Sequence, residues 1–187
     1  QSLDKFKGQI IHPQKWPKDL NYEDKKVIVI GSGATAATIV PEISKKSKHV
    51  TMLQRSPTYY FPSLDEDRFA NLLKKILPTK FSYSFIRLRN VLFQQLLYRV
   101  CRRFPNFVKR KLIDHVRDML PNFDIQKHFT PSYNPWEQRM CLIPNGDLFK
   151  SLRENRATIV TDHIDEFTQN GIKLKSGAEL SADVIVT

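Results

Sequence analysis

The sequence predicts an α/β fold built on a parallel sheet, and three observations lead to this prediction. A continuous β-branched run at 26–30 has the pattern of a strand buried on both faces of a sheet. A glycine-containing turn follows, and apolar residues then recur at helical spacing at Ile39, Val40 and Ile43. A second apolar run at 49–53 completes a strand–turn–helix–strand unit, the repeating unit of parallel α/β domains.

The turn after the first strand carries a dinucleotide-binding pattern. It reads, in order, Gly31, Ser32, Gly33, Ala34, Thr35 and Ala36. Gly31 permits the tight turn, Gly33 lets a pyrophosphate approach the backbone, and small Ala36 permits close packing of helix on strand. The phosphates would lie on the helix amides at the positive end of the helix dipole. The pattern favours a Rossmann-like dinucleotide-binding domain over a plain tight turn.

The end of the second strand indicates which dinucleotide binds. An NAD site usually places an acidic residue there to hold the ribose 2′-hydroxyl. This chain instead has Gln54, Arg55 and Ser56. The forked guanidinium of Arg55 and the hydroxyl of Ser56 both suit a 2′-phosphate, so NADPH is predicted in preference to NADH or FAD. The alternative is that Arg55 is an ordinary exposed arginine.

The middle of the chain predicts helices. Ser63 and Glu66 have the spacing of a capping box, which would begin a helix that Pro78 ends. Apolar residues at helical spacing predict two more helices, over 82–103 and 106–120.

The last fifty residues return to α/β character. A helix is predicted to open at Asp147 and a strand to cover 158–160, and glycine turns at Gly171 and Gly177 predict a small β-meander. The sequence starts without methionine and stops on a strand pattern after Thr187, so both ends are expected to be cut from a longer polypeptide.

Four segments are therefore expected. They are a connector (1–24), the first part of the NADP-binding domain (25–56), a helical insertion (57–137) and the remainder of that domain (138–187). A length of 187 residues, with 41% hydrophobic and 26% charged residues, fits one globular core with such an insertion.

The cysteines and histidines predict no metal site. Cys101 and Cys141 form no C-x-x-C pair, so neither a disulfide framework nor a zinc site is expected, and a reducing cytoplasm is the expected compartment. Cys101 is expected to be buried in a helix. His115 and His128 have no second ligand three or four positions away, so they are expected to be surface and packing residues.

The formal net charge of +11 is concentrated in the insertion. Between Lys74 and Arg117 the chain has twelve lysines and arginines and, of the acidic residues, only Asp114, with Asp118 just beyond. A positive excess confined to one helical stretch favours a solvated face over a nucleic-acid site. Peripheral contact with anionic lipid, or with a protein, is the alternative interpretation.

The connector carries a more specific pattern, F-x-G-x-x-x-H-x-x-x-W-P. Its fixed positions are filled by Phe6, Gly8, His12, Trp16 and Pro17. This pattern resembles the fingerprint of the Baeyer–Villiger type of flavin-containing monooxygenase. The resemblance implies that the segment couples domain movement to catalysis. The alternative is that His12 and Trp16 only pin the connector.

The resemblance extends along the chain and is closest to the ethionamide-activating subgroup. Segments 54–59, 128–139 and 161–165 and the terminal 182–187 are similar to that subgroup. The resemblance implies an FAD domain elsewhere in the same polypeptide, which binds most of the FAD. It also implies that NADPH reduces the flavin and that one oxygen atom from O2 is inserted into a ketone or added to the sulfur of a thio compound.

Arg139 matches the active-site arginine of this family. The resemblance implies that its fixed charge stabilises negative charge on oxygen during the reaction. The alternative is that Arg139 forms a structural ion pair. Many relatives have a lysine just before this arginine that helps to hold the 2′-phosphate, but this chain has Gln138. The contribution of Gln138 to cofactor binding is therefore an open question.

Three other functions compete with this interpretation. A flavin monooxygenase that oxidises nitrogen or sulfur is the closest rival, and the complete fingerprint together with Arg139 argues against it. A pyridine nucleotide–disulfide reductase would need a redox-active cysteine pair, which this chain lacks. The third rival is a stand-alone NADP-binding or interaction module without catalysis.

Overall fold

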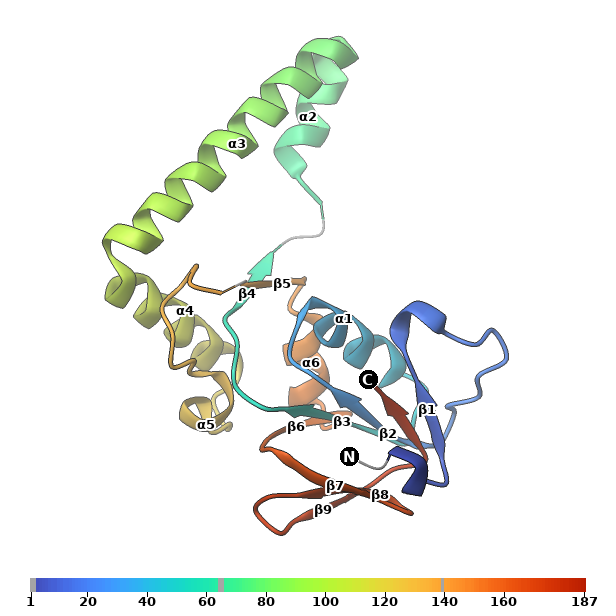
Figure 1. Ribbon diagram of the computed structural model, residues 1–187. Coiled ribbons are helices and arrows are strands. Elements are labelled where there is room, and N and C mark those ends of the chain that lie inside the picture. Colours follow the sequence, from blue (N-terminus) through green and yellow to red (C-terminus); the bar gives the residue numbers. More distant parts are fainter. Residues whose placement is uncertain (1–2, 64–65, 139) are drawn as a thin grey trace.

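The computed structural model describes residues 3–63, 66–138 and 140–187 (Figure 1). Its centre is a five-stranded parallel sheet in the order β1-β10-β2-β3-β6. The strands are β1 (Gln9–Ile11), β10 (Val184–Val186), β2 (Lys26–Ile30), β3 (His49–Gln54) and β6 (Ala157–Thr161). The strands predicted at 26–30, 49–53 and 158–160 are confirmed, and so is the α/β fold class.

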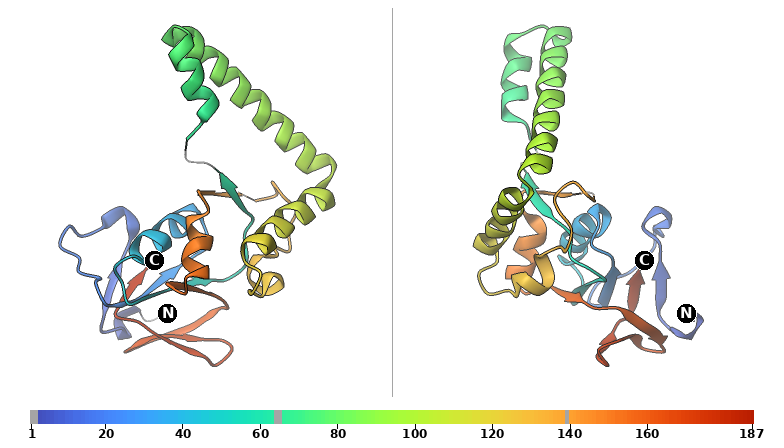
Figure 2. Two further views of the ribbon diagram at one scale, coloured as in Figure 1. Left: turned by 180° about the vertical axis from the view of Figure 1, so that it is seen from behind. Right: turned by 60° about the vertical axis from the view of Figure 1, so that its left-hand side comes forward.

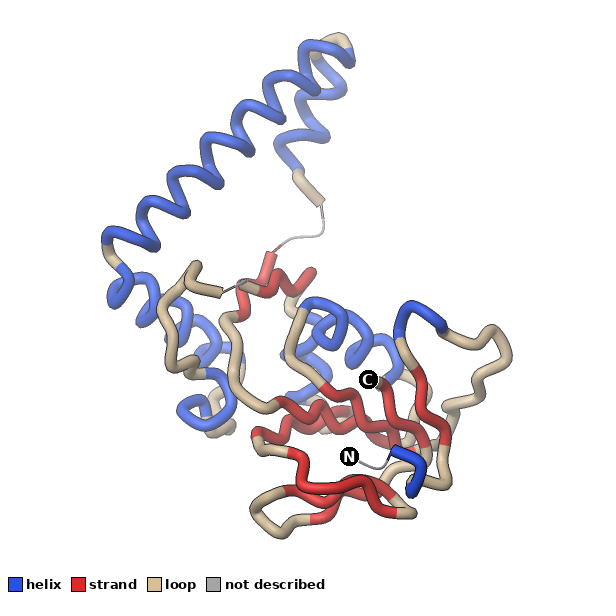
Figure 3. Tube along the Cα trace, in the orientation of Figure 1, coloured by secondary structure: helices blue, strands red, loops and turns tan. Residues whose placement is uncertain are grey.

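Both faces of the sheet are covered. Helices α1 (Ala34–Ile43) and α6 (Asp147–Arg153) pack on one face, where Val27 and Val29 point. An antiparallel meander of β7 (Ile164–Thr168), β8 (Gly171–Leu174) and β9 (Glu179–Ser181) packs on the other face (Figure 3). Ile28 points to this face and packs with residues of the meander. Neighbouring residues of one strand thus enter two different cores, which explains why the strand sequence is continuously apolar.

The first 24 residues are more than a connector. They contain two short 3-10 helices, η1 (Leu3–Lys5) and η2 (Pro13–Lys15), and between them β1, the edge strand of the central sheet. Strand β1 pairs with β10, so that Gln9 lies opposite Val184 and Ile11 opposite Val186. A strand of three residues with one buried side chain leaves no periodic signal in the sequence, and for this reason the sequence did not predict it.

The helices expected in the insertion are present. They are α2 (Arg68–Ile76), α3 (Thr79–Arg103) and α4 (Pro105–Met119). A fourth helix, α5 (Ile125–Phe129), was not predicted. The chain leaves the α/β body along β4 (Tyr60–Ser63) and returns along β5 (Cys141–Pro144), and these two strands pair in parallel. Cys101 is fully buried in α3, as expected.

The predicted capping box at Ser63 is wrong. Ser63 belongs to β4, and the helix begins at Arg68 with Asp67 as its N-cap. The Asp67 carboxylate accepts a hydrogen bond from the Ala70 backbone N–H at 2.9 Å and pairs with Arg89 of α3. The Arg89 guanidinium holds the pKa of Asp67 below its usual range. The pairing of β4 with β5 therefore overrides the local signal.

Helices α2 and α3 (residues 68–103) form an arm that projects away from the α/β body in all three views (Figures 1 and 2). Within the described ranges, no helix combines the length and the apolar character that crossing a membrane would require.

Candidate nucleotide-binding site

The glycine-containing turn joins the end of β2 to the start of α1, at the carboxyl edge of the parallel sheet. Gly31 has φ +125°, a conformation that side-chain-bearing residues rarely adopt, so the turn requires glycine here. Ala36 is buried against the sheet, and it packs in the core with Val27 and Val29. Gly31 and Ala36 thus have the roles in the turn that the sequence pattern predicted.

Gly33 needs a different explanation. Its φ of −75° and ψ of −179° are accessible to any residue, so the backbone does not require glycine. A Cβ placed on Gly33 or on Gly31 would meet no atom within 4 Å. The space above both glycines is therefore open, and a side chain there would fill it. This is the space in which a pyrophosphate would lie, so the residues present fit a dinucleotide.

The first turn of α1 is also suited to an anion. Its N-cap residue is Gly33, which has no side chain to accept hydrogen bonds from the free backbone N–H groups. The helix has ten residues, so its dipole places partial positive charge at the same point. Both effects favour a phosphate group over the turn.

Two contacts hold the turn from below. The Tyr60 hydroxyl donates to the Ser32 carbonyl at 2.9 Å, and the Ser32 hydroxyl donates to the Ser56 carbonyl at 3.3 Å. The Tyr60 ring is itself fixed edge-on by Phe129 and Phe149. Burial raises the pKa of Tyr60, so the hydroxyl keeps its proton and stays a donor. Tyr60 was not predicted from the sequence. Its only signal there was a tyrosine a few positions after Arg55 and Ser56.

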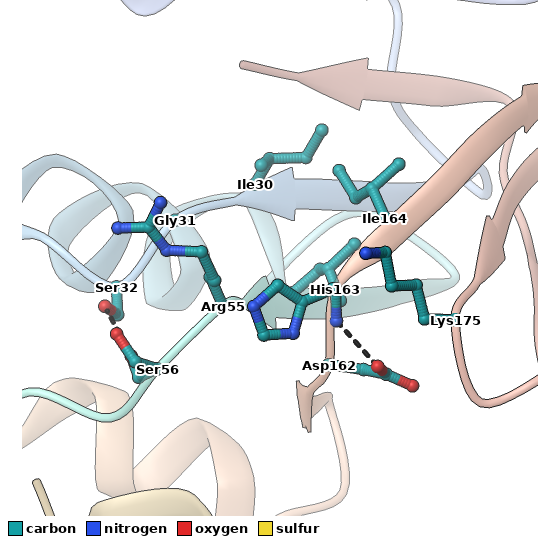
Figure 4. Close-up of a pocket in the computed structure, with 10 residues that line it drawn as sticks. Ile30, Gly31, Ser32, Arg55, Ser56, Asp162, His163, Ile164 and Lys175 are labelled. Carbon is teal, nitrogen blue, oxygen red and sulfur yellow. Dashed lines mark hydrogen bonds between the residues drawn. The ribbon is translucent and has the colours of Figure 1, made fainter. Parts of the chain in front are cut away.

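A pocket of about 590 Å³ opens beside the turn (Figure 4). Gly31, Ser32, Arg55 and Ser56, which the sequence singled out separately, all line it. The structure also adds three polar residues that the sequence did not assign to cofactor binding. These are Asp162, His163 and Lys175.

Lys175 reaches the pocket because the meander folds back over the end of β6. Its backbone N–H donates to the His163 carbonyl at 2.9 Å. Asp162 fixes the same corner, since its carboxylate accepts backbone N–H groups from His163 at 2.6 Å and Ser176 at 3.4 Å. Hydrogen bonds from Ser176 and His163 hold the pKa of Asp162 below its usual range, so it is ionised at neutral pH. Asp162 thus has a structural role at this corner.

Arg55 and Lys175 are exposed, and neither forms an ion pair with any residue that the structure describes. In Figure 4 their side chains lie on either side of His163. Two cations at one pocket without a carboxylate partner of their own are suited to a dianionic group such as a phosphate monoester.

The fingerprint residues have clear packing roles. Phe6 is buried in the core between the sheet and the meander, with Ile28 and Ile185. A Cβ on Gly8 would lie 2.4 Å from the Asp183 carbonyl oxygen and 2.5 Å from the Phe6 ring, so only glycine fits. Trp16 packs edge-on against Tyr22. These contacts explain the residue types at the apolar positions.

His12 lies closer to the candidate site. Its Nδ1 accepts the Gln14 backbone N–H at 3.3 Å and caps η2. His12 also lines a second pocket, of about 290 Å³, together with Gly31, Gly33 and Thr35 of the glycine turn. The fingerprint segment and the dinucleotide turn are therefore neighbours in space.

One predicted residue is not brought into this arrangement. Gln138 is exposed and forms an isolated bridge with Pro135, and it does not line the pocket of Arg55. Arg139 lies outside the described residues.

The two histidines are placed as expected. His115 is exposed on α4, whereas His128 is half-buried and its Nδ1 lies 2.7 Å from the Thr161 hydroxyl oxygen. Burial lowers the pKa of His128, so its ring is neutral at neutral pH.

Comparison with known proteins identifies the family. The family model described as flavin-binding monooxygenase-like matches residues 1–126, about two thirds of the chain. The chain belongs to this family. The family resemblance drawn from the fingerprint is thereby confirmed.

Curated relatives of this flavin-binding monooxygenase-like chain are FAD-containing monooxygenases. The FAD-containing monooxygenase EthA of Mycobacterium tuberculosis is 49% identical over 184 residues, covering 97% of this chain and 38% of EthA. EthA of Mycolicibacterium smegmatis is 50% identical over 186 residues. The chain thus spans about 38% of the length of these relatives.

Solved monooxygenases share the fold. An oxidised steroid monooxygenase bound to NADP superposes with a TM-score of 0.75 at 20% identity, covering 98% of this chain and 42% of that protein. Cyclohexanone monooxygenase from Rhodococcus sp. Phi1, bound to NADP+, gives a TM-score of 0.71 at 18% identity. At this level of identity the likeness shows the fold alone.

Proposed function

We propose that this chain is the NADPH-binding part of an FAD-dependent monooxygenase. The observation that carries the proposal is the pocket in which Arg55, Ser56 and Lys175 stand beside the open turn at Gly31. The glycine turn and the first amides of α1 would hold the pyrophosphate, and Arg55 and Lys175 would hold the 2′-phosphate. Lys175 supplies the ammonium that many relatives place at the position of Gln138.

The chemistry that we propose for the whole protein is that of the Baeyer–Villiger type of monooxygenase, which the chain resembles. FAD, bound mainly by parts of the protein outside this chain, supplies the redox chemistry, and O2 supplies the oxygen atom. The substrate is a ketone, which becomes an ester or lactone, or a thio compound oxidised at sulfur. Arg139 provides the fixed positive charge beside the reacting oxygen. In this proposal His12 transmits movement between the fingerprint segment and the nucleotide turn that it faces.

Two alternatives remain within the family. A nitrogen- and sulfur-oxidising monooxygenase would use the same NADPH site but would not depend on Arg139. A stand-alone NADP-binding module would bind nucleotide without oxygenation. We also propose that the protein is cytoplasmic and that the basic insertion brings it into peripheral contact with anionic membranes.

Titration of the 187-residue chain with nucleotides tests the proposal. NADPH is expected to bind weakly and to bind better than NADH, because only NADPH presents a 2′-phosphate to Arg55 and Lys175. FAD is expected not to co-purify with the chain, because its site lies elsewhere. Calorimetry measures the two affinities, and absorbance measures the flavin content. Stoichiometric flavin on this chain, or equal affinities for the two coenzymes, would contradict the assignment.

A lysine substitution tests the residue that the structure added to the site. Lys175→Ala is expected to lower the affinity for NADPH up to about fivefold, the range for one exposed ammonium, and to leave NADH unchanged. Lys173→Ala is the matched control, because Lys173 is an exposed lysine of β8, two residues before Lys175, that pairs with Glu166 and does not line the pocket. If both variants lose NADPH affinity equally, Lys175 has no specific role.

A further inference from the structure

The arm of residues 68–103 exposes apolar side chains along its whole length. Of the twenty large hydrophobic residues that are exposed in the described chain, thirteen lie in this arm. Phe81, Phe85, Leu88, Leu92 and Leu96 recur every three or four positions, so they share one face of α3, and each is 52–70% exposed. We call these five residues the apolar stripe. A continuous row of exposed large apolar side chains marks an interaction surface.

The same arm is strongly basic. Residues 68–103 contain nine lysines and arginines and no aspartate or glutamate. Arg89 pairs with Asp67, which lies just before the arm. The other eight cations form no ion pair with any residue in the described ranges. The charge of the surface is therefore uncompensated and calls for an anionic partner.

Charge and apolar surface meet at the turn between α2 and α3, which lies far from the sheet (Figures 1 and 2). Lys74, Lys75 and Lys80 flank this tip. Ile76 and Phe81 lie among them and are 68% and 70% exposed, the highest values for large hydrophobic residues in the arm. Tyr83 at 62% and Leu96 at 60% come next. The tip thus combines three ammonium groups with two large apolar side chains.

We propose that the arm docks on the surface of a bilayer that contains anionic lipids. The lysines and arginines contact the headgroups, and the apolar stripe of α3 lies at the boundary between headgroups and acyl chains, in the plane of the membrane. All three lysines of the arm lie at its tip, beside Ile76 and Phe81. Protein–protein interfaces are depleted in lysine, whereas membrane-surface helices combine lysine and arginine with large apolar residues, so the composition of the tip favours lipid over a protein partner. This inference rests on the membrane contact included in the proposed function and specifies the surface that makes it.

Flotation with lipid vesicles tests the docking. The 187-residue chain is mixed with vesicles of phosphatidylcholine alone or with added phosphatidylglycerol, at about 0.05 M and about 0.5 M salt, where screening is weak and strong. The chain is expected to float with the anionic vesicles at low salt, to bind them less at high salt, and to stay behind with neutral vesicles.

Two triple variants separate the charges from the apolar stripe. Lys74→Gln, Lys75→Gln and Lys80→Gln together are expected to weaken binding to anionic vesicles about 100-fold, at roughly fivefold for each lysine. Phe85→Ser, Leu88→Ser and Leu92→Ser together keep every charge and are expected to abolish the binding that survives at high salt. The matched control is Lys7→Gln, Lys18→Gln and Lys48→Gln, which removes the same charge from exposed lysines of the α/β body and is expected to float as the unmodified chain does.

Several outcomes overturn the proposal. They are flotation that does not depend on lipid charge, equal losses in the arm and control lysine variants, and unchanged binding of the serine variant at both salt concentrations. Association of the arm with a second copy or another protein, with no flotation, also overturns it. Circular dichroism verifies that each variant is folded. NADPH titration of the same variants is expected to be unchanged, so failure of the nucleotide site and failure of the docking are distinguished.

Discussion

Arg139→Ala in the whole protein is expected to stop oxygenation while flavin reduction by NADPH continues. The proposed charge acts on negative oxygen after hydride transfer, so the earlier step does not need it. Loss of one electrostatic stabiliser of this kind costs about 10²–10³ in rate, far more than loss of a surface ion pair worth less than about 1 kcal/mol. Anaerobic stopped flow measures reduction, and product formed per NADPH consumed in air measures coupling.

A conservative variant serves as the control for Arg139. Arg139→Lys is expected to restore oxygenation only in part, because a compact ammonium does not reproduce the planar fork of a guanidinium. If Arg139→Ala both reduces normally and couples NADPH to product, then Arg139 is a structural residue. That result would favour the nitrogen- and sulfur-oxidising alternative.

Arg55→Ala is expected to weaken NADPH about ten- to 150-fold and to leave NADH nearly unchanged. The range corresponds to a lost charge-assisted contact of about 1.5–3 kcal/mol, and only NADPH carries the phosphate that makes the contact. Arg55 is exposed and has no carboxylate partner among the described residues, so its removal breaks no ion pair of the fold. Calorimetric titration with both coenzymes gives the two affinities.

An arginine outside the pocket provides the comparison for Arg55. Arg110 is exposed on α4, and Arg110→Ala removes the same charge from the insertion. It is expected to bind both coenzymes as the unmodified chain does. Equal losses for NADPH and NADH in Arg55→Ala would remove Arg55 from the phosphate site.

The sequence predicted the elements whose environment is uniform along the chain. Strand β2 is buried on both faces and reads as one apolar run, and α1 follows a turn whose glycines have a local physical reason. Strand β1 was not predicted, because its three residues are held by hydrogen bonds to β10, which is far away in sequence. The capping box at Ser63 failed for a related reason, since a non-local strand pairing competed with a local motif.

The candidate site was predictable only in part. Arg55 and Ser56 follow β3 directly, so their place at the carboxyl edge of the sheet could be deduced from the strand pattern. Lys175 follows β8 of the meander, and a hydrogen bond from its backbone N–H to the His163 carbonyl places it at the pocket. No periodic pattern in the sequence predicts this contact. Tyr60 lies on β4, which pairs with β5 at the two ends of the insertion, and its hydroxyl donates to the Ser32 carbonyl of the glycine turn. This contact depends on the tertiary fold, so the sequence did not predict it.

The position of β10 between β1 and β2 has a consequence for folding during synthesis. Gln9 pairs with Val184, so β1 has no neighbour in the sheet until almost the last residue of this chain has been made. At about 5–20 residues per second, the ribosome takes roughly 10–35 s to cover that distance. The core between α1, β2 and β3 can form early because its contacts are close in sequence, whereas closure of the sheet has high contact order and comes last. Until then the edge of β2 that later receives β10 is an unpaired strand edge, the kind of surface on which newly made chains associate.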